Sequence, residues 1–125
     1  MSKTKLSILG KKVTKFTKLE TFPKPPNVTE VVCTSDEVTA TCPITKQPDW
    51  YVVRIAYRPK YLCVESKALK LYLQSFRNAG HFCENFSNII ASDLMKALRA
   101  EQVEVTVTQK PRGGIAIVST AIVYT

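Results

Sequence analysis

Cys42 and Asp49 are the two residues whose types and spacing best suit nucleophilic chemistry. Cys42 opens the segment CPITKQP (residues 42–48), a turn bracketed by two prolines, and Asp49 starts the strand expected to return from it. A thiolate is a strong nucleophile, and a carboxyl group beside it can move a proton. We therefore expect a hairpin that exposes the thiol and brings both side chains to one substrate. A structural cysteine followed by a turn-capping aspartate would explain the same spacing.

A second set of residues could bind an anion. Lys67 and Lys70 are three residues apart, so they neighbour each other near the start of a helix expected over residues 65–78. Arg112 lies in the PRGG segment, which is a turn signal. Together these cations could hold a phosphorylated cofactor, although solvated surface lysines are the simpler interpretation.

Glu84 lies in the segment GHFCEN, before an apolar stripe that predicts a second helix over residues 84–98. Its carboxylate could accept two hydrogen bonds from the edge of a base. A first-turn glutamate that stabilises the helix dipole explains the position equally well.

The cysteines do not form a recognisable metal or disulfide pattern. Cys33, Cys42, Cys63 and Cys83 are 9, 21 and 20 residues apart, whereas structural zinc sites usually take closely spaced pairs. No secretory signal is apparent, which argues against a disulfide framework. At least one cysteine could thus serve chemistry, and no metal site is expected.

The elements that must position these residues follow from the apolar periodicity. Strands are expected over residues 29–40, 49–59, 102–109 and 114–124, with both helices between the second and third strand. The alternation in the first strand is imperfect. The order ββααββ predicts an α+β fold, an antiparallel sheet with two helices on one face.

Such a sheet leaves one face and two edge strands without partners, a state that proteins usually remove by covering or by association. The uncovered face would carry Arg54, Arg58, Glu104 and Thr106, which suits the inner wall of a barrel shared among subunits. We therefore expect a homo-oligomer.

Length and charge limit the remaining possibilities. The 125 residues (14.0 kDa) suit one domain, and no apolar run is long enough for a membrane helix, so we expect a cytoplasmic protein. The net charge of +8 is concentrated at the start: residues 1–25 hold seven lysines against Glu20 alone. The segment FPKPPN (residues 22–27) then separates a basic arm (1–27) from a catalytic domain (28–125). This arm is the only feature that favours an RNA-binding module, and no RNP-like motif supports it.

The segments CPITKQPDW, ESKALKLYLQSFRN, GHFCEN and PRGGI resemble, in order and spacing, the single-module QueF family of NADPH-dependent 7-cyano-7-deazaguanine reductases. The resemblance runs from about residue 40 to residue 117, and ESKALKLY is its most specific part. It implies a tunnelling fold (T-fold), in which subunits form two stacked pentameric rings, a decamer, with active sites between subunits. It also implies reduction of a nitrile to 7-aminomethyl-7-deazaguanine with two NADPH for queuosine tRNA modification. Nucleic acid is not required.

The resemblance also implies residue roles. Cys42 would attack the nitrile carbon to give a covalent thioimide, and Asp49 would protonate the nitrogen. The substrate base would be bound by Glu84, helped by Ser66, Phe82 and Cys83. NADPH would be bound by four residues: Glu65, Lys67, Lys70 and Arg112.

Cys83 departs from the family pattern, because many members have a histidine just before the substrate-binding glutamate. Cys83 would either form a disulfide with Cys42 on oxidation or be a packed small residue.

Archaeosine-forming amidinotransferase relatives generally lack the ESK motif, so Glu65, Ser66 and Lys67 favour a reductase. GTP cyclohydrolase chemistry would need a metal site, which one histidine and widely spaced cysteines make improbable.

Overall fold

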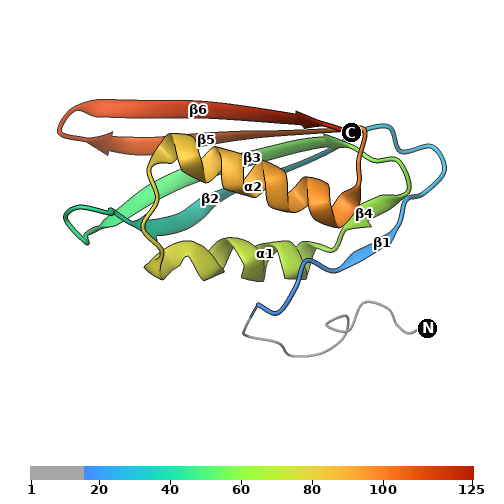
Figure 1. The fold of residues 1–125 in the computed structure, drawn as a ribbon, viewed down its shortest axis with the longest axis horizontal. Helices are drawn as coiled ribbons and strands as arrows, with labels where there is room; N and C mark the ends of the chain where they lie inside the picture. Colours follow the sequence, from blue (N-terminus) through green and yellow to red (C-terminus); the bar gives the residue numbers. More distant parts are fainter. Residues whose placement is uncertain (1–15) are drawn as a thin grey trace.

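The computed structural model describes residues 16–125. Four long strands form one antiparallel sheet in the order β2-β3-β5-β6: β2 (Val31–Thr41), β3 (Pro48–Arg58), β5 (Gln102–Arg112) and β6 (Ile115–Tyr124). The helices α1 (Ser66–Gln74) and α2 (Cys83–Leu98) both cover one face of this sheet (Figure 1). The expected α+β arrangement is therefore confirmed.

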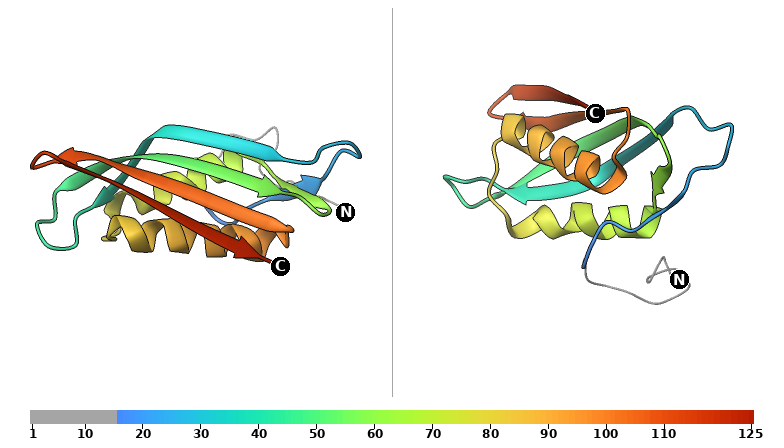
Figure 2. Two further views of the ribbon diagram at one scale, coloured as in Figure 1. Left: turned by 90° about the horizontal axis from the view of Figure 1, so that it is seen from above. Right: turned by 45° about the vertical axis from the view of Figure 1, so that its right-hand side comes forward.

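The core lies between the sheet and the helices. The alternate β3 residues Tyr51, Val53, Ile55 and Tyr57 are buried, because a strand points successive side chains to opposite faces. Buried valines on β5 and the apolar stripe of α2 complete the contact. The opposite face, seen in front in the left view of Figure 2, is not covered by helices.

A β-bulge explains the imperfect alternation of the first long strand. The pairing of β2 with β3 shifts register between Ser35 and Val38. The extra residue changes which side chains face the helices, so that Val38 and Ala40 are buried after it.

A second, two-stranded sheet was not predicted. β1 (Thr21–Pro23) pairs with β4 (Leu62–Val64), and Glu20 just before β1 is buried. β1 thus lies within the stretch that the sequence analysis expected to be a basic arm (1–27), and it packs against the folded part. The rest of the expected basic arm, residues 1–15, lies outside the described residues.

The ends of the helices and strands follow local rules. The Glu65 carboxylate caps α1 by accepting the Ala68 N–H at 2.7 Å, and the helix continues as the 3-10 turn η1 (Ser75–Asn78). β5 and β6 are joined by Gly113 and Gly114, whose φ angles of 65° and 84° suit glycine in a tight hairpin. Across residues 16–125, no helix combines the length and apolar character needed to cross a membrane.

Candidate active site

The turn after β2 holds Cys42 close to the start of β3. The Cys42 N–H donates to the Gln47 carbonyl at 2.7 Å, and the Lys46 N–H donates back to the Cys42 carbonyl at 3.0 Å. Asp49 pairs with Ala40 across the hairpin, and its side chain is buried. The hairpin expected from residues 42–49 is therefore present.

Arg112 joins the two candidate catalytic residues. Its Nη2 lies 3.5 Å from Cys42 Sγ, and its Nη1 lies 3.1 Å from Asp49 Oδ1. Arg112 is the last residue of β5, which pairs with β3, so the sheet brings the second hairpin turn over the first. From the sequence we expected Arg112 to bind a phosphorylated cofactor together with Lys67 and Lys70. Within one chain, Arg112 instead contacts Cys42 and Asp49.

The pKa of the Cys42 thiol is lowered to about 6. The main cause is a hydrogen bond from the Thr45 hydroxyl, followed by the backbone N–H groups of Thr45 and Ile44 and then by Arg112. These donors stabilise the thiolate. Sequence reasoning missed Thr45, although a hydroxyl residue three positions after a cysteine in a turn was a usable signal. The expected exposure of the thiol is wrong, because Cys42 is only 3% exposed.

The start of α2 lies at the same end of the sheet as the two hairpin turns (Figure 1). Phe82 and Glu84 are exposed there, so both are accessible to a ligand. Cys83 is buried, and its thiol lies 3.5 Å from the Val107 carbonyl and 3.8 Å from that of Ile117. Burial raises the pKa of the Cys83 thiol. Cys42 and Cys83 are both free in this structure, and the disulfide that oxidation would form between them stays a prediction.

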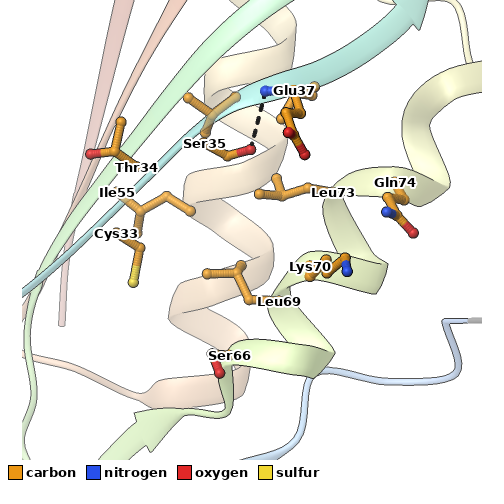
Figure 3. A pocket seen from close by; sticks show the side chains of 12 residues that line it. Cys33, Thr34, Ser35, Glu37, Ile55, Ser66, Leu69, Lys70, Leu73 and Gln74 are labelled. Atoms are coloured by element: carbon orange, nitrogen blue, oxygen red, sulfur yellow. Dashed lines mark hydrogen bonds between the residues drawn. The ribbon is translucent and has the colours of Figure 1, made fainter. Parts of the chain in front are cut away.

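Ser66 and Lys70 line a pocket of about 250 Å³ between α1 and the strands β2 and β3. Figure 3 shows Ser66 in the first turn of α1, Lys70 one turn further along, and Cys33 across the pocket. Glu65 is buried, and its carboxylate is engaged in the helix cap. Lys67 follows Ser66 on the same helix and is half-buried.

Comparison with known proteins identifies the family. The model of the QueF-like protein family matches residues 48–124. The chain belongs to this family. It is 46% identical over 103 residues to the NADPH-dependent 7-cyano-7-deazaguanine reductase of Frankia casuarinae, covering 82% of both chains. The enzyme of the same name from Bacteroides thetaiotaomicron is 46% identical over 123 residues, covering 92% of this chain and 81% of the relative.

A solved structure shares the fold of this QueF-like chain. The crystal structure of the archaeosine synthase QueF-Like in the apo form aligns with a TM-score of 0.72, covering 79% of this chain and 95% of the other. Its sequence identity is 22%, so the likeness concerns the fold alone.

In this QueF-like chain, the two groups of candidate residues lie near opposite ends of helix α1. Cys42 follows Thr41, whose hydroxyl and N–H donate to the carbonyls of Arg77 and Ala79, beyond the C-terminal end of α1. Ser66 lies at the opposite end of that helix, beside β4 (Figure 1). One chain thus brings together Cys42, Asp49 and Arg112 but does not bring them to Ser66. Among residues 16–125, no group of three His, Cys, Asp or Glu side chains could hold a metal ion.

Proposed function

We propose that this chain is an NADPH-dependent nitrile reductase that converts 7-cyano-7-deazaguanine to 7-aminomethyl-7-deazaguanine for queuosine tRNA modification. One observation carries the proposal: a thiol with a pKa of about 6 and a buried carboxyl both contact Arg112, in a chain 46% identical to reductases of that name. Activated thiols of this kind attack electrophilic carbon, and a nitrile carbon is one.

The first step joins Cys42 to the nitrile carbon. A C–S bond forms, one π bond of the nitrile breaks, and the nitrogen gains a proton, which gives a thioimide. The proton that leaves the thiol balances the one that the nitrogen gains. Asp49 would carry it, because Arg112 links Asp49 and Cys42 within hydrogen-bond distances.

NADPH would supply two hydrides, so two molecules are consumed. With one hydride and one proton the thioimide carbon is reduced, the C–S bond then breaks to restore the Cys42 thiolate and leave an imine, and a second hydride and proton convert the imine to the amine. The residues present fit a phosphorylated cofactor: the Lys67 and Lys70 ammonium groups carry the opposite charge, and Lys70 lines the pocket at α1. Ser66 lines the same pocket, and we expect its hydroxyl to contact the substrate base. Glu65 would act indirectly, by fixing the start of α1.

Glu84 and Phe82 would bind the base. The exposed Glu84 carboxylate can accept hydrogen bonds from the N–H groups of a guanine-like edge, while the exposed Phe82 ring offers a stacking surface. Cys83 would support this turn from beneath through its packing on β5 and β6.

The complete site would form between subunits of a homo-oligomer of two stacked pentameric rings. The separation of Ser66 from Cys42 supports this, since α1 of one subunit could meet the Cys42 turn and Arg112 of another. The edge strand β6 also exposes apolar side chains, including Val118, Ile122 and Tyr124. Exposed apolar groups on an edge strand favour association.

The test combines NADPH absorbance with intact-mass spectrometry of the full chain and 7-cyano-7-deazaguanine. We expect two NADPH oxidised per amine formed, and a thioimide adduct without NADPH that is absent from Cys42→Ala. An adduct on wild type with no NADPH consumption would favour an amidinotransferase instead. Neither adduct nor NADPH consumption, with tight tRNA binding, would favour an RNA-binding module.

A further inference from the structure

Three tyrosines are buried in the core, and their hydroxyl groups differ in their hydrogen-bond partners. The Tyr57 oxygen accepts the Val64 N–H at 3.0 Å, and the Tyr72 hydroxyl donates to Asp93 Oδ2 at 2.6 Å. The Tyr51 oxygen is buried with no hydrogen-bond partner among the described residues. A buried hydroxyl without a partner is costly, so its presence calls for a reason.

Packing does not supply that reason. Tyr51 is 0% exposed, and its ring makes an edge contact with Phe86 at a centroid distance of 5.0 Å. A phenylalanine would fill the same space and make the same ring contact, without an unpaired polar atom.

The position of the hydroxyl connects it to the catalytic end of the sheet. Tyr51 follows Asp49 by two residues on β3, so both side chains lie on the same, buried face. Burial and the charges of Asp49 and Cys83 raise the pKa of Tyr51 to about 12, with smaller effects of Arg112 and Cys42. The phenol is therefore neutral at physiological pH and can both donate and accept a hydrogen bond.

Asp49 needs such a neighbour during the reaction. In the structure its carboxyl group is paired with Arg112 at 3.1 Å, so this pair must open before the carboxyl can turn towards a substrate. Cys42 is nearly covered, so a nitrile reaches Sγ only after a neighbouring side chain moves, and the Arg112 side chain, which contacts Sγ, is 46% exposed. Once Arg112 leaves, the carboxyl can pass a proton to the nitrile nitrogen as the thiolate attacks the carbon, but it has lost its hydrogen-bond partner.

We propose that Tyr51 is a positioning residue whose hydroxyl bonds to the Asp49 carboxyl when Arg112 leaves, holding it in its proton-carrying form towards the nitrile nitrogen. This inference rests on the proposed nitrile chemistry. Hydrogen bonds of catalytic groups are commonly incomplete in the free enzyme and form only with substrate present, which fits the unpaired hydroxyl.

Tyr51→Phe tests the inference, with Tyr57→Phe as the matched control on the same face of the same strand. The rate of thioimide formation at saturating nitrile, without NADPH, should fall about tenfold in Tyr51→Phe, as part of the general-acid contribution. The nitrile concentration for half-maximal rate should not change, and Tm should stay equal or rise, since an unpaired polar atom is removed. Tyr57→Phe should lower Tm and leave the rate unchanged.

A double variant shows whether Tyr51 acts through Asp49. In an Asp49→Asn background, Tyr51→Phe should cause no further loss of rate. A wild-type rate in Tyr51→Phe, or a full tenfold loss in that background, would overturn the inference. A fall in Tm as large as that of Tyr57→Phe, with the rate unchanged, would make the hydroxyl structural. If the wild type itself forms no adduct, the proposed function fails, and this inference fails with it.

Discussion

Arg112 Nη2 lies 3.5 Å from Cys42 Sγ, although 70 residues separate the two in the sequence. The turn of one hairpin thus covers the thiol of another. Because the Arg112 side chain is 46% exposed while Cys42 is almost fully buried, the arginine can move without disturbing the core. Arg112 therefore acts on both the charge and the access of the nucleophile.

Alkylation of Cys42 by iodoacetamide should have a pH midpoint near 6, because only the thiolate reacts and its pKa is lowered to about 6. Thr45→Val removes the largest cause of that shift, so the midpoint should move to higher pH and the rate at pH 7 should fall. Thr39→Val, which lies on β2 outside the turn, is the control and should leave the midpoint unchanged. An unchanged midpoint in Thr45→Val would contradict the role of the hydroxyl.

Arg112→Ala should give a pH profile of alkylation that crosses that of the wild type. Loss of the cation raises the Cys42 pKa, so the variant should react more slowly near pH 6, and loss of the cover should make it react faster well above the midpoint. Lys70→Ala should leave the profile unchanged and raise the KM for NADPH instead, because Lys70 lines the pocket at α1. Coincident profiles for Arg112→Ala and wild type would show that the contact has no effect in solution.

Glu84→Gln should weaken capture of the nitrile base without changing the KM for NADPH. The amide replaces one acceptor by a donor that faces the N–H groups of the base, which leaves polar groups unpaired. Calorimetric titration of the nitrile base into the protein measures the affinity. Tm should change little, since Glu84 is exposed. Affinity equal to that of the wild type would leave Glu84 as a helix-end carboxylate.

Glu65→Ala should lower the free energy of unfolding by about 0.5–2 kcal/mol, because it removes the cap of α1. Glu65→Asp, which keeps a capping carboxylate, should recover part of this loss in urea unfolding. Should Glu65→Ala raise the KM for NADPH many-fold at unchanged stability, Glu65 would instead contact the cofactor.

Mixing Cys42→Ala, which lacks the nucleophile, with Lys70→Ala, assayed at an NADPH concentration well below the raised KM of Lys70→Ala, tests whether the site is shared between subunits. Cys42→Ala removes a residue from the group near the C-terminal end of α1, and Lys70→Ala removes one from the group on α1 itself. If each site takes one group from each of two subunits, unfolding and refolding a 1:1 mixture should restore about a quarter of the sites. The readout is NADPH oxidation, and refolding each variant alone is the control. No recovery, despite mixed oligomers seen by native mass spectrometry, would place both groups of a site in one chain.

Local pattern was enough to predict the four long strands and both helices, because burial imposes its own period on each element. The alternation around Val53 and the helical stripe around Leu69 both correspond to buried faces. β1 and β4, each of three residues, are too short to show a period, so their pairing appears only in three dimensions. The bulge between Ser35 and Val38 disturbs the pattern of β2, because its extra residue shifts the alternation of buried and exposed side chains.

The site was predictable only where it is local. Cys42 and Asp49 belong to one hairpin, so their proximity follows from a short turn. The contact of Arg112 with both depends on the order of strands in the sheet, which the sequence pattern alone does not specify. The unpaired hydroxyl of Tyr51 was equally hidden, since a tyrosine in an apolar alternation looks like any other core residue.

The long separation of Cys42 from Arg112 has a consequence during synthesis on the ribosome. The groups that do most to ionise the thiol, Thr45 and Ile44, belong to its own turn, whereas Arg112 is added 70 residues later. The nascent chain thus carries the means to activate its thiol before the side chain that covers it exists. Where this turn forms before Arg112 is added, the thiol of a new chain is open to peroxide and other electrophiles that reach the mature thiol only past Arg112.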